Sequence, residues 1–414
     1  MTSGTRDVLI AGGGLIGASL AVALAPLALR IAVVEAQLAA SAAQPSYDDR
    51  STAISEGSRR VLSAIGVWPR IGTAATAIRS IHVSDRGRFG VTRLEAAEHG
   101  VTALGYVVEN RVLGAALWQR LTASPSIEVI APGRVLDAEL REEAASVSIE
   151  SDGAQRTLAT RLLVVADGAH SSLRERLGVR AERREYGQVA IVVNVTPRRF
   201  HQHVAYERFT DSGPLAFLPT TNGRCAVVWT VWAEEADEIL ALDDAAFLAR
   251  LQALFGHRLG TLLRAGRRST WPLELVTAEQ QTGERFVVLG NAAHALHPVG
   301  GQGFNLALRD VAVLAELIAD AVAKGTDPGE GALLARYASW RHDDQARSVG
   351  FTDGVVRLFT NPFTPVKAAR GAGLVALDLL PFAKEALARQ SMGLAGRLPR
   401  LARGLPLECA TTTT

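Results

Sequence analysis

The sequence predicts an α/β protein of two domains: a Rossmann-like domain with a βαβ unit, a mostly antiparallel β-sheet domain, and helices at the C-terminal end. Three observations predict this class. Short apolar runs at 7–11, 31–35 and 162–166 stand next to glycine turns and helical spacing. Alternating or β-branched segments separated by Gly-containing turns occupy residues 187–271. Helical spacing dominates after residue 305.

Composition supports a folded protein without a global charge signal. The 414 residues are 48% hydrophobic, enough for a sizeable core and for roughly two to three domains. The formal net charge of +2 gives no reason to expect a nucleic-acid partner. Cys225 and Cys409 lie far apart and lack metal-type spacing, which fits a reducing compartment. We therefore expect a cytoplasmic protein without a cysteine metal site or disulfide framework.

The apolar stretch Val8–Leu29 has two interpretations. It carries no charge and follows Arg6, so hydropathy alone would allow a signal peptide or a membrane span. The alternative is a strand, a glycine turn and a helix, which accounts for Gly12–Gly14, Gly17 and Pro26 together. We favour the second interpretation.

The first glycine motif matches G-x-G-x-x-G at Gly12–Gly17. A strand at Asp7–Ala11 precedes it, a helix is expected over Leu15–Leu29, and a second strand, Ile31–Glu35, ends in an acid 18 residues after Gly17. In this pattern Gly12 makes the turn, Gly14 lets a pyrophosphate approach, Gly17 packs the helix on the strand, and Glu35 accepts from ribose hydroxyls. An acid at Glu35 argues against a 2′-phosphate.

Two further strands end in glycine-containing loops. Leu162–Ala166 is followed by Asp167 and Gly168, and Asp167 fits a helix N-cap, a position beside a ligand, or both. Phe286–Gly290 leads into a loop with Gly300, Gly301 and Gly303, and helical spacing begins at Asn305. This last segment is either an ordinary tight turn or a place where backbone N–H groups meet a ligand.

His294 and His297 lie three residues apart in the last loop and suggest an acid–base or metal pair. A third ligand is not apparent, so we expect no metal site and a hydrogen-bonded structural role for His294.

The predicted domain order follows from where the chain changes between helical spacing and alternating or β-branched segments. We expect one domain over 1–185, with about 75–105 contributing to the second domain; an antiparallel domain over 186–275; a return to the first domain over 276–360; and a tail over 361–414. A helical interlude is expected over Phe247–Leu263. Three tryptophans in the antiparallel part, favoured as core over a binding box, are Trp229, Trp232 and Trp271.

The C-terminal tail is basic. Eight Lys or Arg and two Asp or Glu lie between Arg357 and Arg403, with leucines and Phe382 between them. Such a tail suits an anionic membrane surface or a partner protein, and equally a helical cap on the core. Its apolar runs are too short to span a bilayer.

Three loops in this order at wide spacing resemble the group A flavoprotein aromatic hydroxylases, the relatives of para-hydroxybenzoate hydroxylase. They are GGGLIG at Gly12–Gly17, ADGAHSSLR at Ala166–Arg174 and GNAAHALHPVGGQGFNLALRD at Gly290–Asp310. Within this family the chain resembles the ubiquinone-biosynthesis hydroxylases, and among those the 2-octaprenyl-6-methoxyphenol hydroxylase type. The segments that carry the finer resemblance are Asp49–Ile54, Tyr106–Arg111, Ala376–Asp378, Met392-Gly393 and Gly396–Pro399.

The resemblance implies FAD as cofactor and NAD(P)H as electron donor, without a second glycine motif for the nicotinamide nucleotide. Arg50 and Arg111 would steady the phosphate and ribityl parts, with the Val135 backbone near the adenine. Asp167 would lie close to the flavin and take part in NAD(P)H use. The residues assigned to cofactor binding are Gly12, Gly14, Leu15, Ile16, Gly17, Glu35, Arg50, Arg111, Val135, Asp167, Asn291, Pro298, Gly301, Gly303, Phe304 and Asn305.

One residue departs from the wider family pattern. Asn291 stands where most members have Asp, and its amide oxygen still accepts hydrogen bonds while one negative charge is removed. The 2-octaprenyl-6-methoxyphenol hydroxylase type is expected to carry Asn at this place, so the residue supports that subgroup.

The implied activity is an O₂- and NAD(P)H-using monooxygenase. It would hydroxylate a polyprenylated phenol resembling 2-polyprenyl-6-methoxyphenol in ubiquinone biosynthesis, through a C4a-hydroperoxyflavin. The alternatives are another flavin-dependent aromatic hydroxylase, a flavin dehydrogenase or reductase that does not need O₂, and a non-catalytic member of a biosynthetic complex. The implied partners are the phenol, O₂, a ubiquinone-biosynthesis complex and the surface of the inner membrane. The sequence identifies neither a catalytic base nor an oligomeric state.

Overall fold

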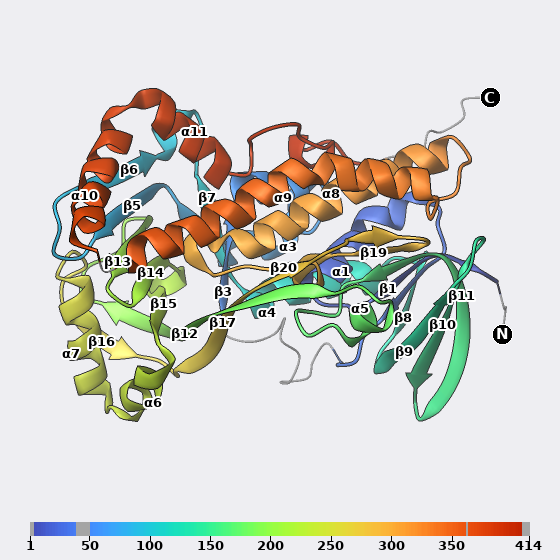
Figure 1. Cartoon of the computed structure of the whole chain (residues 1–414), viewed down its shortest axis with the longest axis horizontal. Coiled ribbons are helices and arrows are strands. Elements are labelled where there is room, and N and C mark those ends of the chain that lie inside the picture. The colour runs from blue at the N-terminus through green and yellow to red at the C-terminus, as the bar shows by residue number, and fades with distance from the viewer. Residues whose placement is uncertain (1–3, 39–49, 362, 408–414) are drawn as a thin grey trace.

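The computed structural model describes residues 4–38, 50–361 and 363–407. The molecule is elongated, with one sheet system at each end (Figure 1). Two long helices, α8 (Gln302–Ala323) and α9 (Gly331–Thr360), run along the length between the ends and pack on each other. Of the two cysteines, Cys225 is buried and Cys409 lies outside the described residues.

The first sheet has a parallel centre. Its order in the described residues is β18-β19-β11-β1-β2-β8, and the β9–β10 hairpin extends it through β11. The central strands are nearly all apolar because both faces are covered, as expected for buried parallel strands. The strands are β1 (Arg6–Ala11), β2 (Ile31–Val34), β8 (Ile127–Ile130), β9 (Gly133–Leu140), β10 (Ala145–Ser151), β11 (Ala154–Val165), β18 (Thr282–Gly283) and β19 (Phe286–Val288).

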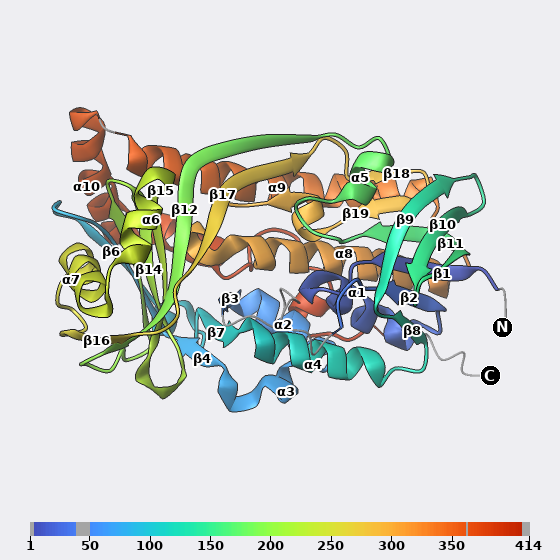
Figure 2. The same ribbon diagram turned by 90° about the horizontal axis from the view of Figure 1, so that it is seen from below.

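The second sheet is mostly antiparallel. Its order in the described residues is β20-β17-β12-β15-β14-β13-β5-β6, with β16 beside β12, and β13 and β5 form its parallel pair. The strands are β5 (Ser80–Asp85), β6 (Val91–Glu95), β12 (Ala181–Pro197), β13 (Val204–Thr210), β14 (Gly213–Pro219), β15 (Cys225–Trp232), β16 (Leu262–Ala265), β17 (Ser269–Ala278) and β20 (His294–Ala295). The 17-residue strand β12 runs from the second sheet toward α5 and the first sheet (Figure 2).

A small third sheet, β3-β7-β4, lies between the other two. It consists of β3 (Ser51–Ser55), β4 (Thr76–Ile78) and β7 (Gly105–Glu109). The helices α1 (Leu15–Leu24), α2 (Glu56–Ala64), α3 (Trp68–Ile71), α4 (Asn110–Thr122) and α5 (Ser172–Arg176) surround the first and third sheets. Helices α6 (Ala233–Ala241) and α7 (Asp244–Phe255) cover the second sheet.

The fold class predicted from the sequence is confirmed, with four local differences. The first helix ends at Leu24 and continues as one 3₁₀ turn, since Pro26 has no N–H to extend the helix. Residues 51–55, for which the sequence indicated no strand, form strand β3. The helical interlude begins at residue 233, earlier than predicted. Trp229 is buried, but Trp271 is 38% exposed and lies under the Arg50 guanidinium, so it is not core.

The C-terminal tail folds back on the body as α10 (Thr364–Leu379), α11 (Pro381–Ser391) and a 3₁₀ turn at Leu401–Arg403. Several of its cations pair with acids of the body: Arg370 with Asp85 at 3.2 Å, Lys384 with Glu98 at 3.0 Å, and Arg400 with Asp320 at 2.6 Å. The tail is therefore a helical cap whose positive charge is partly neutralised.

Candidate functional site

Three loops meet because the strands before them are parallel neighbours. β1 pairs with β11 and β2, and β11 pairs with β19, so their carboxyl ends lie at one edge of the sheet. The edge surrounds a cavity of about 1200 Å³ that is partly open to solvent, called the loop cavity below. Its lining residues are Gly12, Gly14, Leu15, Ile16, Glu35, Arg50, Ser51, Thr52, Asn110, Ala166, Asp167, Gly168, Gly290, Asn291, Phe304 and Ala307.

The first glycine turn excludes side chains for steric reasons. A Cβ on Gly12, whose φ is +104°, would stand 2.4 Å from the Ala166 carbonyl oxygen. A Cβ on Gly17 would stand 1.9 Å from the Gly12 carbonyl oxygen. Gly14 is the N-cap residue of α1 and lines the loop cavity, and no side chain of the described residues caps this helix. The helix therefore presents backbone N–H groups toward the loop cavity.

Glu35 follows β2 and is held by two backbone donors. Its Oε2 accepts from Gly13 N at 2.6 Å, and its Oε1 accepts from Gln37 N at 2.9 Å. Each carboxylate oxygen keeps a second lone pair for a ligand. Glu35 also lines a smaller adjoining cavity together with Val135, Gly12 and Asp167.

Asp167 lies where the two cavities meet. Its side chain faces the cavity space, yet burial by the surrounding protein raises the pKa of this carboxyl, and a hydrogen bond with Ser171 partly opposes the shift. Asp167 is not the N-cap residue of α5, although its carboxylate takes a hydrogen bond from the backbone of Leu173 in the first turn of that helix. The cap of α5 is Ser171, whose Oγ accepts from Arg174 N at 3.0 Å, because the chain makes one more turn before the helix begins.

Arg174 fastens two of the three loops together. Its side chain is 1% exposed, and Nη1 donates to the Ala292 carbonyl oxygen at 2.9 Å. Arg174 ends the second loop motif, and no role was predicted for it from the sequence. No local signal in the sequence indicates this role, because Arg174 is the third residue of a short helix, where an arginine is usually exposed.

The two predicted arginines occupy different places. Arg50 lines the loop cavity, with its guanidinium 3.9 Å from the centre of the Trp271 ring. Arg111 lies in the first turn of α4 and forms an ion pair with Glu109 at 2.5 Å; it follows Asn110, which lines the loop cavity.

The start of α8 separates the loop cavity from a second one. Asn305 donates to the Ala53 carbonyl oxygen at 2.8 Å and accepts from Ser55 N at 2.8 Å, which ties α8 to β3. Phe304 faces the loop cavity, and Gly301 is the left-handed N-cap residue of α8. Pro298 accepts from Gly301 N at 2.9 Å, and Gly303 has open space where a side chain would stand. Four predicted residues of this loop are outside the set that lines the loop cavity: Pro298, Gly301, Gly303 and Asn305, the last of which lines the second cavity.

The second cavity, called the apolar cavity below, has about 1070 Å³ of empty space including its mouth. It lies between the second sheet, the start of α8 and helices α9–α11. Its walls are mainly aliphatic and aromatic, with Ile54, Val83, Leu94, Phe209, Phe359, Leu374, Leu377 and Leu387 among the lining residues. Strand β3 contributes Ser51 and Thr52 to the loop cavity and Ile54 and Ser55 to the apolar cavity, so the two cavities share a wall.

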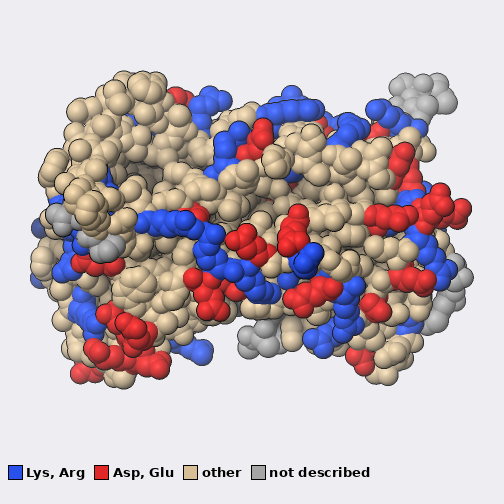
Figure 3. Space-filling model, in the orientation of Figure 1, with Lys and Arg blue, Asp and Glu red and all other residues tan. Residues whose placement is uncertain are grey.

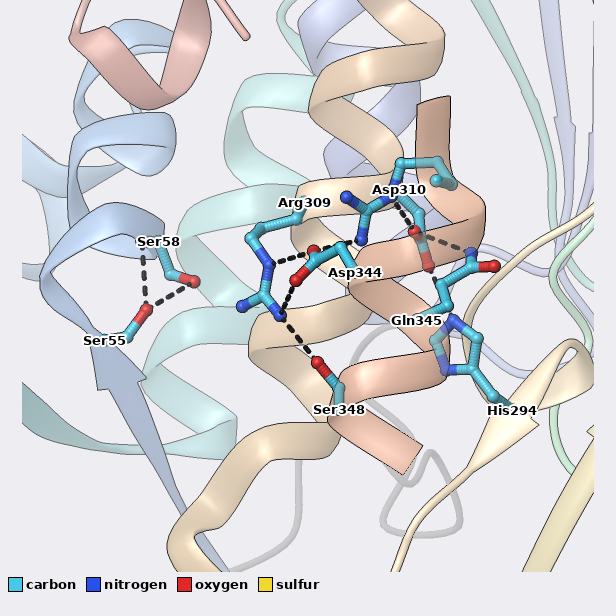
Figure 4. A network of polar contacts seen from close by, with 9 residues as sticks. Ser55, Ser58, His294, Arg309, Asp310, Asp344, Gln345 and Ser348 are labelled. Carbon is cyan, nitrogen blue, oxygen red and sulfur yellow. Dashed lines mark hydrogen bonds and ion pairs between the residues drawn. The ribbon is translucent and has the colours of Figure 1, made fainter. Parts of the chain in front are cut away.

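A buried polar network joins the third loop, α8 and α9 (Figure 4). Asp310 is fully buried and accepts from His294 Nε2 at 2.6 Å, Arg341 Nε at 2.5 Å and Gln345 Nε2 at 2.9 Å. Burial by itself would raise the pKa of Asp310, but Arg341 and His294 oppose it and hold the pKa below its usual range. His294 therefore connects the third loop to α8 and α9.

The two histidines of the third loop have different hydrogen-bond partners. Among the described residues no group of three His, Cys, Asp or Glu side chains is placed to hold an ion. His297 is buried, its Nδ1 accepts from Val299 N at 3.2 Å, and burial lowers its pKa to about 4. The ring is therefore neutral at pH 7.

The family model and the relatives found by comparison with known proteins agree with one another. A family model described as "FAD binding domain" matches residues 5–352. The ubiquinone hydroxylase UbiL of Rhodospirillum rubrum is 39% identical over 405 residues, covering 97% of this chain and 93% of the relative. The 3-demethoxyubiquinol 3-hydroxylase of Escherichia coli is 29% identical, covering 95% and 100%. The mitochondrial ubiquinone biosynthesis monooxygenase COQ6 of Homo sapiens is 27% identical, covering 93% and 92%.

Solved structures share the fold at low sequence identity. The p-nitrophenol 4-monooxygenase PnpA of Pseudomonas putida DLL-E4 superposes with a TM-score of 0.77 at 17% identity, covering 95% of this chain and 99% of the other. PqsL of Pseudomonas aeruginosa, in complex with 2-aminobenzoylacetate, gives 0.75 at 23% identity, covering 90% and 100%.

Proposed function

The chain belongs to the FAD-binding family of flavin-dependent aromatic monooxygenases, in the branch that contains the ubiquinone hydroxylases, and from this we propose that it hydroxylates a polyprenylated phenol in ubiquinone biosynthesis. One structural observation supports the proposed class of substrate. The apolar cavity shares a wall with the loop cavity, so an apolar substrate held there would lie next to a cofactor held in the loops. The proposed phenol resembles 2-polyprenyl-6-methoxyphenol.

FAD fits the residues that surround the loop cavity. The N-termini of α1 and α8 offer backbone N–H groups without a side-chain cap among the described residues, which suits a pyrophosphate and the electron-rich edge of a flavin ring. Glu35 has acceptor capacity left for ribose hydroxyls. At Gly168 and Gly303 no atom lies within 4 Å of the position of a Cβ, so a ligand can approach the backbone.

We assign the cofactor contacts accordingly. Gly12, Gly14 and Gly17 shape the turn for the pyrophosphate, Glu35 binds the adenosine ribose, and Arg50 lies beside the phosphates. The remaining proposed contacts are made by Leu15, Ile16, Arg111, Val135, Asp167, Asn291, Pro298, Gly301, Gly303, Phe304 and Asn305. Bound FAD, reduced by NAD(P)H and reacted with O₂, supplies an electrophilic oxygen atom. The protein's own task is to place the phenol ring, exclude water from it and manage its proton.

The direct test uses the purified holoprotein with NADPH or NADH, isotopically labelled dioxygen and candidate prenylphenols. The expected product carries one labelled oxygen on the ring. Turnover of a phenol that proceeds equally well without O₂ would instead assign a dehydrogenase or reductase, and a protein that neither retains nor rebinds FAD would remove the proposal.

The apolar cavity can be tested separately with two leucines of α10. Leu377 lines the cavity, whereas Leu379 is 71% exposed on the same helix. Leu377→Trp fills cavity space, so the KM for a prenylated phenol is expected to rise about tenfold, worth ~1.4 kcal/mol, while FAD content stays unchanged. Leu379→Trp is the matched control and should leave KM unchanged in an assay without vesicles. Equal KM values for both variants would show that the prenyl group binds elsewhere.

We propose that the end of the molecule formed by α10 and α11 rests on a membrane surface. These helices line the apolar cavity on one side and expose Phe363, Leu379, Leu380 and Phe382 on the other. The visible face over them carries few charged side chains (Figure 3). No helix among the described residues is long and apolar enough to cross a bilayer. Because several tail cations are already paired with acids of the body, the apolar residues should contribute more to binding than charge does.

Cosedimentation with phosphatidylcholine vesicles and with vesicles containing phosphatidylserine tests this surface. The double variant Leu379→Ser, Phe382→Ser is expected to lose most binding to both kinds of vesicle and to keep its FAD. Unchanged cosedimentation would contradict the proposal. Membership of a biosynthetic complex and the domain boundaries given above stay predictions.

A further inference from the structure

One acidic side chain lies in the wall of the apolar cavity. Glu207 is in the middle of β13, where it pairs with Ala216 of β14 and Val83 of β5. Alternation along the strand places Glu207 on the same face as Phe209, and Val83, Glu207 and Phe209 all line the cavity. Of the described residues that line this cavity, Glu207 is the one with an ionisable side chain.

The carboxyl of Glu207 has an unused hydrogen-bonding atom. Its Oε1 is buried and has no hydrogen-bond partner among the described residues. Polar neighbours in the cavity wall are already engaged: Thr92 donates to the Leu374 carbonyl oxygen at 2.8 Å, and Asn305 bonds to β3 as described above. Since a buried carboxyl without a partner is costly, its presence points to a ligand that supplies the partner.

The charged groups on neighbouring elements are directed elsewhere. On β5, His82 contacts Tyr206, which is on the other face of β13 from Glu207, and Asp85 is paired with Arg370 of α10. On α9, Asp353 is bonded to Arg184 and Tyr186. Burial, unopposed by a nearby cation among the described residues, raises the pKa of Glu207 to about 8. The side chain is therefore mostly protonated at pH 7 and becomes ionised as the pH rises through about 8.

We propose that Glu207 is the catalytic residue that holds the hydroxyl group of the phenolic substrate and accepts its proton. This inference rests on the proposed function. The phenol O–H bond breaks, the proton moves to the Glu207 carboxylate, and the electron pair stays on the phenol oxygen, where it increases the electron density of the ring. The ring carbon would then take a hydroxyl group from the oxygen that reduced FAD and O₂ supply, as the O–O bond breaks and its electron pair stays on the oxygen left behind. The ring carbon loses its own hydrogen as a proton to water, and Glu207 returns its proton to the ring oxygen.

The experiment compares the parent with Glu207→Gln, which keeps the size of the side chain and a hydrogen-bonding oxygen but cannot accept the proton. Hydroxylated product, NAD(P)H consumption and FAD content are measured between about pH 6 and pH 9. The parent's kcat/KM is expected to rise with pH through about 8, whereas E207Q should lose this rise and about 100-fold of its product formation. NAD(P)H oxidation in E207Q should continue and yield peroxide in place of product. Glu139→Gln, an exposed strand position, is the matched control and should behave as the parent.

A binding measurement gives a readout without turnover. Geranylphenol added to the oxidised holoprotein is expected to show the ultraviolet absorption of its phenolate at high pH in the parent and to remain un-ionised in E207Q. Glu207→Asp retains a carboxylate and should retain the pH dependence at a lower rate, which keeps the proposal falsifiable if E207Q does not fold. An E207Q variant with the parent's product rate and pH profile would overturn this inference alone. A parent that hydroxylates no phenol would overturn the proposed function instead.

Discussion

Replacing Asp310 by asparagine is expected to destabilise the folded protein and to loosen FAD binding. Asp310 is fully buried and accepts hydrogen bonds from His294, Arg341 and Gln345. Asparagine removes the negative charge and turns an NH₂ group toward one of these donors. Arg341 then keeps only its ion pair with Asp344, at 2.7 Å, among the contacts that neutralise it.

The magnitude follows from what remains of the network. Removing one partner of a buried ion pair costs about 3–5 kcal/mol because the other charge stays buried. Since Arg341 retains Asp344, we expect the low end, about 3 kcal/mol, which changes the unfolding equilibrium by roughly 100-fold. Because His294 ties the third loop to Asp310, the FAD of the variant should also dissociate more readily than that of the parent.

Urea unfolding of the FAD-free and FAD-bound forms measures both effects, with flavin absorbance reporting cofactor release. Glu238→Gln, in the exposed pair with Arg250, is the control and should not change the midpoint measurably. The pKa of Asp310 is lowered in the folded state, so its contribution is present above the ordinary carboxyl pKa near ~4 and is lost as the pH falls below it. A variant within about 0.5 kcal/mol of the parent at pH 7 would refute this reasoning.

Three further predictions follow from local contacts: two concern the loops, and the third concerns the contact between Arg50 and Trp271. Gly17→Ala should abolish FAD retention because its Cβ would lie 1.9 Å from the Gly12 carbonyl oxygen, whereas Gly354→Ala in α9, with no atom within 4 Å, should retain FAD; equal flavin content in both purified proteins would contradict the steric argument. Arg174→Met should weaken FAD binding about tenfold, worth ~1.4 kcal/mol, through loss of the bond to Ala292, as measured by flavin fluorescence titration; an unchanged Kd would show that the two loops meet without it. Trp271→Ala should remove the stacking contact of the Arg50 guanidinium and weaken FAD binding severalfold in the same titration, and tighter binding would mean that the stacking competes with the cofactor.

The loops of the proposed cofactor site could be predicted because their strands, glycines and acids lie close together in the chain. A strand, a glycine turn and a helix at Gly12–Gly17, with an acid 18 residues later, can be identified from spacing alone. The structure brings Gly12, Glu35, Asp167 and Asn291 to one cavity, as parallel strands require. Their contacts with FAD remain proposals.

The sequence by itself determined the fold class, the family and the three loops. Glycines, apolar runs and caps set the backbone conformation within a few residues of their own position, so their effect can be predicted locally. The tertiary structure alone decided that β3 divides two cavities, that Arg174 joins two loops, that tail cations pair with distant acids, and that Glu207 faces an apolar space. Each of these depends on which strands pair and in which register, and pairing between residues far apart in the chain leaves little local trace. The one local sign of Glu207 is its position two residues before Phe209 on β13, which places both side chains on the same face of the strand.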